Sequence, residues 1–78
     1  IRINAVCPGA TETPRRARRT AHLSEDALQA HHTALAQAIP IGRVAQAQEI
    51  ANAVLWLSSD ASSYVVGHGL VVDGGLHA

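Results

Sequence analysis

The stretch Asn4-Ala5-Val6-Cys7-Pro8-Gly9-Ala10-Thr11-Glu12-Thr13-Pro14 decides the fold class. Residues 1–7 alternate in character, which predicts a β-strand. One face carries Ile1, Ile3, Ala5 and Cys7, and the other carries Arg2, Asn4 and Val6. Pro8 has no backbone donor and Gly9 can take positive φ, so the strand should end there. Ligands of open α/β sheets bind beyond the carboxyl ends of strands, which makes the loop after Gly9 the first place to seek a site.

Two helices are expected after this loop. Thr13-Pro14 has the form of an N-cap followed by proline at the first helical position, which predicts a helix from Pro14 to about Ala21. A second start follows at Ser24, with acidic residues in the first turn where they suit the helix dipole. Pro40-Ile41-Gly42 should end that helix.

A further helix and a last strand complete the predicted order. Residues 49–57 place Ile50, Ala53, Val54 and Leu57 on one face, the spacing of a helix with one buried side. Its start is expected to be weakly capped, because Gln46 and Ala47 stand where Ser, Thr or Asp would help. Residues 70–72 should form a buried strand, which Asp73-Gly74-Gly75 ends. This order indicates an α/β protein with a parallel sheet.

Length and composition narrow the class of protein. The chain has 78 residues and a formal net charge of zero, so it is one small domain with no charge-driven partner. It opens on Ile1 inside an apolar run, so we expect a piece of a longer protein. Its one cysteine, Cys7, should be a small buried residue rather than a reactive thiol, and a lone cysteine fits a reducing compartment. No apolar run approaches the ~20 residues of a membrane span, so we expect a cytoplasmic protein without membrane contact.

Several segments together resemble the C-terminal part of a short-chain dehydrogenase/reductase (SDR). The resemblance rests on residues 2–9, Pro40-Ile41-Gly42-Arg43, Glu49-Ile50-Ala51, residues 54–60 and Val71-Val72-Asp73-Gly74-Gly75, in that order. It implies the C-terminal portion of a Rossmann-like doubly wound parallel sheet, with the last two strands, lid helices and one core helix. Residues 1–14 would then be strand and cofactor loop, 15–41 a substrate lid, and 42–78 the final helix and strand.

The resemblance also implies a cofactor site. In the family, the loop after Pro-Gly packs on the nicotinamide end of NAD or NADP. Carried over, the cofactor-binding residues are Pro8, Gly9, Ala10, Thr11 and Thr13. Thr11 would contribute backbone groups and Thr13 its hydroxyl. From spacing alone, Thr13 is equally well explained as a helix N-cap, and the two roles are compatible.

The implied reaction is hydride transfer between an alcohol and a carbonyl. The family's catalytic residues are a serine and a tyrosine followed four positions later by lysine. This chain has no lysine, so none of its residues is assigned as catalytic and the catalytic group is expected before Ile1. The alternative is a catalytically dead truncated product that acts only as an association or structural segment. The expected partners are a small-molecule substrate and further copies, as a homodimer or homotetramer.

The arginines and histidines leave other functions open. The basic cluster Arg15, Arg16, Arg18 and Arg19 could clamp an anionic substrate, although a solvated helix face or subunit contact is the simpler interpretation. Such a short cluster on a neutral chain does not predict nucleic-acid binding. The histidines His22, His31, His32, His68 and His77 lack the i, i+4 spacing of a helical zinc site, so no metal is expected. Trp56 falls off the Ile50 face, where it could anchor a subunit interface or fill a core.

Overall fold

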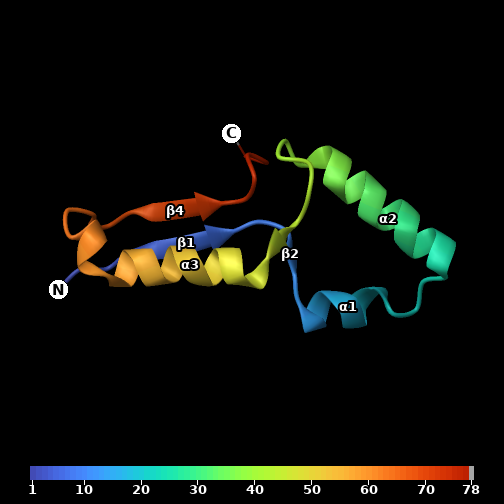
Figure 1. Cartoon of the computed structure of the whole chain (residues 1–78), viewed down its shortest axis with the longest axis horizontal. Helices are drawn as coiled ribbons and strands as arrows, with labels where there is room; N and C mark the ends of the chain where they lie inside the picture. The colour runs from blue at the N-terminus through green and yellow to red at the C-terminus, as the bar shows by residue number, and fades with distance from the viewer. Residues whose placement is uncertain (78) are drawn as a thin grey trace.

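The computed structural model of the chain describes residues 1–77. Its elements in chain order are β1 (Ala5–Pro8), β2 (Thr11–Glu12), α1 (Pro14–Thr20), α2 (Glu25–Ala38), β3 (Ala45–Gln46), α3 (Ala47–Ser58), the 3₁₀ turn η1 (Asp60–Ser62) and β4 (Gly69–Val72). The strands form two parallel pairs, β1 with β4 and β2 with β3. The predicted α/β class with parallel strands is therefore confirmed (Figure 1).

The pair β1–β4 joins the two ends of the chain. Ala5 lies opposite Gly69 and Pro8 opposite Val72. Pairing begins before β1 itself, because the Gly67 amide donates to the Ile3 carbonyl at 2.8 Å. The predicted strand over residues 1–7 thus has the right place, but the strand of the structure begins only at Ala5 and includes Pro8. On the edge of β1 away from β4, no strand pairs within residues 1–77.

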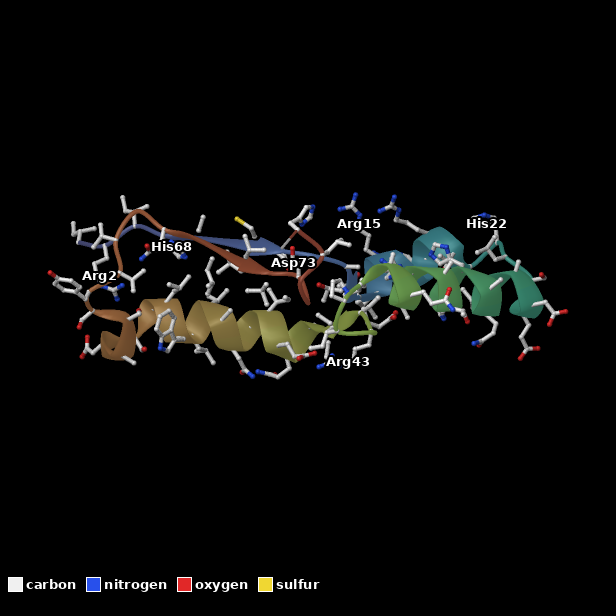
Figure 2. All side chains as sticks on the ribbon, turned by 90° about the horizontal axis from the view of Figure 1, so that it is seen from above. Arg2, Arg15, His22, Arg43, His68 and Asp73 are labelled. Carbon is white, nitrogen blue, oxygen red and sulfur yellow. The ribbon has the colours of Figure 1, made fainter. Side chains whose placement is uncertain are left out.

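Only one face of this strand pair is covered. Helix α3 runs along the side that carries Arg2, Asn4 and Val6, which are half-buried (Figure 2). The opposite side is apolar and open: Ile3 is 76% exposed and Val71 is 54% exposed. The predictions that Cys7 and the last strand are buried are wrong for this chain. The physical reason is that no element within residues 1–77 packs on that face, where Cys7 is exposed.

The starts of α1 and α2 follow the sequence prediction. The Thr13 hydroxyl accepts a hydrogen bond from the Arg16 amide at 3.1 Å, and Pro14 occupies the first helical position. The Ser24 hydroxyl accepts from the Ala27 amide at 3.2 Å. Each cap satisfies one of the amides that a helix start leaves without an intrahelical acceptor.

Helix α3 begins two residues earlier than predicted, at Ala47. The expectation of a weak start is wrong, because the Glu49 carboxylate accepts from the Gln46 amide at 2.9 Å. Arg43 holds that carboxylate through two hydrogen bonds of 2.7 and 3.0 Å. The acceptor at the start of α3 is therefore the side chain of Glu49, which lies inside the helix, rather than the side chain of the N-cap residue Gln46.

Arg2 completes the other end of α3. Its guanidinium donates to the carbonyls of Leu57 and Ser59 at 3.2 and 3.1 Å. It also reaches the Val65 carbonyl at 3.2 Å and the Ser62 hydroxyl at 3.3 Å. The last carbonyls of a helix lack intrahelical donors, so one side chain from the opposite end of the chain supplies them. Ser62, at 1% exposure, is fully enclosed by this arrangement.

The chain is elongated rather than globular. It measures 48 × 24 × 15 Å, and its radius of gyration is 15.2 Å. A compact domain of this length would have a radius of gyration of about 11–12 Å. Within residues 1–77, the buried apolar side chains are Ile39 and Leu57, at 4% and 8% exposure. Strands β1 and β4 with α3 lie at one end, and α1 with α2 lies at the other (Figure 1). No helix within residues 1–77 combines the length and apolar character that crossing a membrane requires.

Candidate functional site

The loop at the carboxyl end of β1 is fixed to the chain at several points. The Gly9 amide donates to the Val72 carbonyl at 3.0 Å, and the Ala10 carbonyl accepts from the Ala45 amide at 2.9 Å. Residues 11–12 then pair with residues 45–46 as β2 and β3. Sequence reasoning missed this second pair, because two-residue strands leave no periodic pattern. The loop is therefore held from both sides rather than projecting freely.

Gly9 is required by a close contact. A Cβ added to Gly9 would stand 2.6 Å from the Asp73 Cβ and 2.9 Å from the Asp73 Cα. Real Cβ atoms do not approach other atoms so closely. The reason expected from the sequence, a positive φ, is wrong, since Gly9 is not among the glycines with positive φ. The turn after β1 thus packs directly against the turn after β4.

The two threonine hydroxyls of the loop have different partners. Thr11 Oγ1 donates to the Gly9 carbonyl at 3.0 Å, within its own turn. Thr13 Oγ1 accepts from the Arg16 amide, and a hydroxyl also carries one hydrogen of its own to donate. The cap on α1 therefore leaves Thr13 able to donate to a ligand oxygen. A carboxamide or phosphate oxygen is such an acceptor, so the donor chemistry of this loop fits the nicotinamide end of a dinucleotide.

A cavity of about 260 Å³ lies at the carboxyl end of β4. Its walls come from the loop after β1, from residues 41–49 and from the strand and turn of residues 71–75: Ala10, Ile41, Arg43, Ala45, Glu49, Val71, Val72, Asp73, Gly74 and Gly75. Gly74 packs so tightly that an added Cβ would stand 2.7 Å from Ile41 Cγ2. Residues 40–42, whose motif was singled out in the sequence, therefore close over the glycine turn that ends β4.

The acidic groups beside this cavity are engaged within the chain. The hydrogen bonds from Arg43, followed by the bond from the Gln46 amide, lower the pKa of Glu49 to about 2. Asp73 accepts from His77 Nδ1 at 2.8 Å and from the Gly75 amide at 3.0 Å. The hydrogen bond from His77 is the largest cause that lowers the pKa of Asp73. Neither carboxylate is thereby poised as a proton acceptor near neutral pH.

The remaining residues singled out in the sequence lie apart from this loop or at its edge. Arg15, Arg18 and Arg19 are exposed on α1, whereas Arg16 is half-buried. His31 and His32 are neighbours on α2, with ring centroids 6.0 Å apart. Within residues 1–77, no three His, Cys, Asp or Glu side chains gather as a metal site. Trp56 is exposed on α3.

The chain is similar to known proteins over almost its whole length. The family model described as enoyl-(acyl carrier protein) reductase matches residues 1–77. The 3-oxoacyl-(acyl-carrier-protein) reductase of Thermotoga maritima is 47% identical over 76 residues, which are 97% of this chain and 28% of that protein.

Two solved structures share the fold of the chain. The ligand-free aldohexose dehydrogenase of Thermoplasma acidophilum superposes with a TM-score of 0.85 at 33% identity, over 97% of this chain and 31% of that one. A putative 2-deoxy-d-gluconate 3-dehydrogenase of Agrobacterium tumefaciens with bound NADP gives a TM-score of 0.79 at 38% identity, over 99% and 29%. The chain thus spans less than a third of the length of these proteins.

Proposed function

Because the chain belongs to the short-chain dehydrogenase/reductase family, we propose that it is the C-terminal part of an NAD(P)-dependent oxidoreductase. The enzyme would interconvert an alcohol and a carbonyl compound. The observation that carries the proposal is the loop of residues 8–13, which leaves the carboxyl end of a parallel strand. In open α/β sheets this is where ligands bind.

Each loop residue has a role in this proposal. Pro8 and Gly9 end the strand and bring the loop against Asp73, since only a glycine fits there. Ala10 and Thr11 would present backbone groups to the nicotinamide carboxamide. The hydroxyl of Thr13 would donate to the carboxamide or to the nearby phosphate. When bound, the cofactor supplies or accepts the hydride, and these residues hold its reactive end in place.

The chemical step itself is assigned to residues outside this chain. With no lysine in the sequence, the tyrosine–lysine pair of the family has no counterpart here. Tyr64 is followed four positions later by His68, and it lies after α3 in a fully exposed position. We therefore place the catalytic serine, tyrosine and lysine before Ile1, together with the glycine-rich turn that would select NAD or NADP.

Two further parts of the proposal concern the lid and the assembly. Residues 15–41 form α1 and α2, which extend away from the strands (Figure 1). We propose that they close over the substrate, and that the open faces of α3 and β4 contact other copies in a homodimer or homotetramer. Slower hydrogen exchange in residues 15–41 on addition of cofactor and substrate would support the lid. Light scattering of the enzyme as a strict monomer would contradict the assembly.

One experiment tests the function directly. The coding frame that contains this chain is read upstream of Ile1, and the encoded protein is assayed for NADPH and NADH oxidation with carbonyl substrates. A Tyr-x-x-x-Lys segment, a glycine-rich turn and carbonyl-dependent oxidation are expected. A stop codon or unrelated sequence at that position would instead support the alternative, a truncated product that only associates with other chains.

A further inference from the structure

Two adjoining cavities lie between β2, α1 and α2. Their volumes are about 220 and 160 Å³, and both are lined by Glu12, Arg16 and His32. The remaining walls are mainly apolar and include Leu23, Leu28 and Leu35. Together the cavities reach the lower end of the roughly 300–1,000 Å³ that small-molecule sites occupy. We call them the lid groove.

Arg16 is the unusual residue of the lid groove. The Nε atom of its guanidinium is buried, and within residues 1–77 it has no hydrogen-bond acceptor. Buried donors are nearly always paired, because leaving one unpaired forfeits its hydration without a replacement. A guanidinium presents its donors as a planar fork that matches the two oxygens of a carboxylate. The unpaired Nε–H of Arg16 is therefore a donor that a carboxylate oxygen could accept from.

The other charged groups of the lid groove do not fill this role. Arg43 lines the larger cavity, but Glu49 already neutralises it through a contact of 2.7 Å. Glu12 lines both cavities and is exposed, and no ion pair within residues 1–77 joins it to Arg16. The exposed arginines of α1 add positive charge nearby and likewise have no acidic partner among residues 1–77. Among the cations that line the lid groove, Arg16 is thus the one without an ion-pair partner within residues 1–77.

We propose that the lid groove binds an apolar carboxylate, with its carboxylate on Arg16 and its hydrocarbon part along the leucines. This rests on the proposed function and specifies its substrate: an alcohol or carbonyl compound that also carries an acidic group. The location agrees with that role. The backbone amide of Arg16 donates to Thr13 Oγ1 at 3.1 Å, so the first turn of α1 carries both the proposed anion site and the proposed cofactor contact.

The test uses the enzyme that contains this chain, labelled with ¹⁵N in its arginines. Octanoate is titrated as the charged probe and octanol as the uncharged probe of the same length. NADPH is titrated separately in the same samples. The Nε–Hε resonance of Arg16 is assigned by its loss in Arg16→Lys. The binding variants are Arg16→Gln and, as the matched control, Arg19→Gln, which changes an exposed arginine of the same helix.

Octanoate is expected to shift the Arg16 Nε–Hε resonance and to bind at least about ten-fold more tightly than octanol. Arg16→Gln should remove that preference, and Arg19→Gln should keep it. The proposal is overturned if octanol binds as tightly as octanoate, if neither binds, or if Arg16→Gln has no effect. It is also overturned if octanoate binds and leaves the Arg16 Nε–Hε resonance unchanged.

The NADPH titration separates this inference from the proposed function. NADPH binding without an Arg16-dependent preference for octanoate would leave the oxidoreductase proposal standing and remove the carboxylate site. Octanoate binding through Arg16 without NADPH binding would establish the anion site and contradict the cofactor proposal. The octanoate-dependent shift is read in the unmodified protein, and NADPH titration of each variant in the same samples shows whether that variant keeps its cofactor binding.

Discussion

Gly9 and Asp73 lie in contact at the carboxyl ends of two strands that the sequence separates by most of its length. A Cβ on Gly9 would stand 2.6 Å from the Cβ of Asp73. The same Asp73 accepts hydrogen bonds from Gly75 and His77, which shape the end of the chain. The proposed cofactor loop therefore takes its position from the turn that follows β4.

Gly9→Ala should destabilise the protein that contains this chain by about 1–3 kcal/mol, because the added methyl group overlaps the Cβ and Cα of Asp73, which cannot rotate away. Chemical denaturation measures the loss. Gly69→Ala is the matched control, since its Cβ would lie at an ordinary 3.6 Å from Cys7 Sγ. Equal stability of the two variants would show that the Gly9–Asp73 contact is not a constraint.

Thr13→Val should weaken dinucleotide binding about three- to thirty-fold, because it removes the hydroxyl donor and keeps the shape of the side chain. It should also lower stability by ~1 kcal/mol, since the cap on the Arg16 amide is lost. Thr13→Ser keeps the hydroxyl and should retain most of both properties. Titration with NADPH and thermal melting separate the two roles. A lower melting temperature with unchanged affinity would leave Thr13 as a cap alone.

Arg2→Ala should destabilise the fold by about 1–3 kcal/mol. The substitution leaves the Leu57 and Ser59 carbonyls, and the enclosed Ser62 hydroxyl, without the donors of the guanidinium. Arg2→Lys keeps the charge but not the fork, so it should recover only part of the loss. Denaturant midpoints provide the measurement, with Arg18→Ala as the exposed control. A midpoint for Arg2→Ala that matches the control would assign Arg2 no structural role.

The Arg43–Glu49 pair should make stability depend on pH in acid. The ordinary pKa of the Glu49 carboxyl is 4.5, and the folded pKa is about 2. A depressed folded pKa stabilises the fold above the unfolded value, and this contribution declines as pH falls from 4.5 toward 2. Glu49→Gln should flatten that part of the curve. The side chains of Arg43 and Glu49 are 53% and 41% exposed, so added salt should reduce the contribution of this pair to stability. An identical acid limb in Glu49→Gln would contradict this assignment.

The 78-residue chain by itself should not fold cooperatively. Its open apolar face, on which Ile3 is 76% exposed, and the unpaired edge of β1 favour association between copies. Calorimetry and light scattering of the purified chain test this. A cooperative melt of a monomer would show that the fragment is sufficient for its own fold.

Local patterns predicted the elements well, and long-range contacts account for what they missed. Thr13 and Ser24 cap α1 and α2 as expected, because a cap depends on residues within one turn. The β2–β3 pair and the Arg2 contacts join residues far apart in the chain, which no periodicity reveals. The lid groove was equally hidden, since the sequence shows a cluster of four arginines without showing which one is half-buried. The proposed cofactor-binding residues came from the family resemblance, and only the geometry identified the contact that requires Gly9.

The pairing of Ala5 with Gly69 has a consequence for synthesis. A ribosome makes β1 first and reaches β4 only after more than sixty further residues, about 3–13 s later at ~5–20 residues per second. During that interval residues 5–8 have no C-terminal strand to pair with. Chaperones that recognise short apolar segments can bind the unpaired first strand at this stage. A codon change that slows the translation of residues 9–68 would lengthen the time for which that strand is exposed.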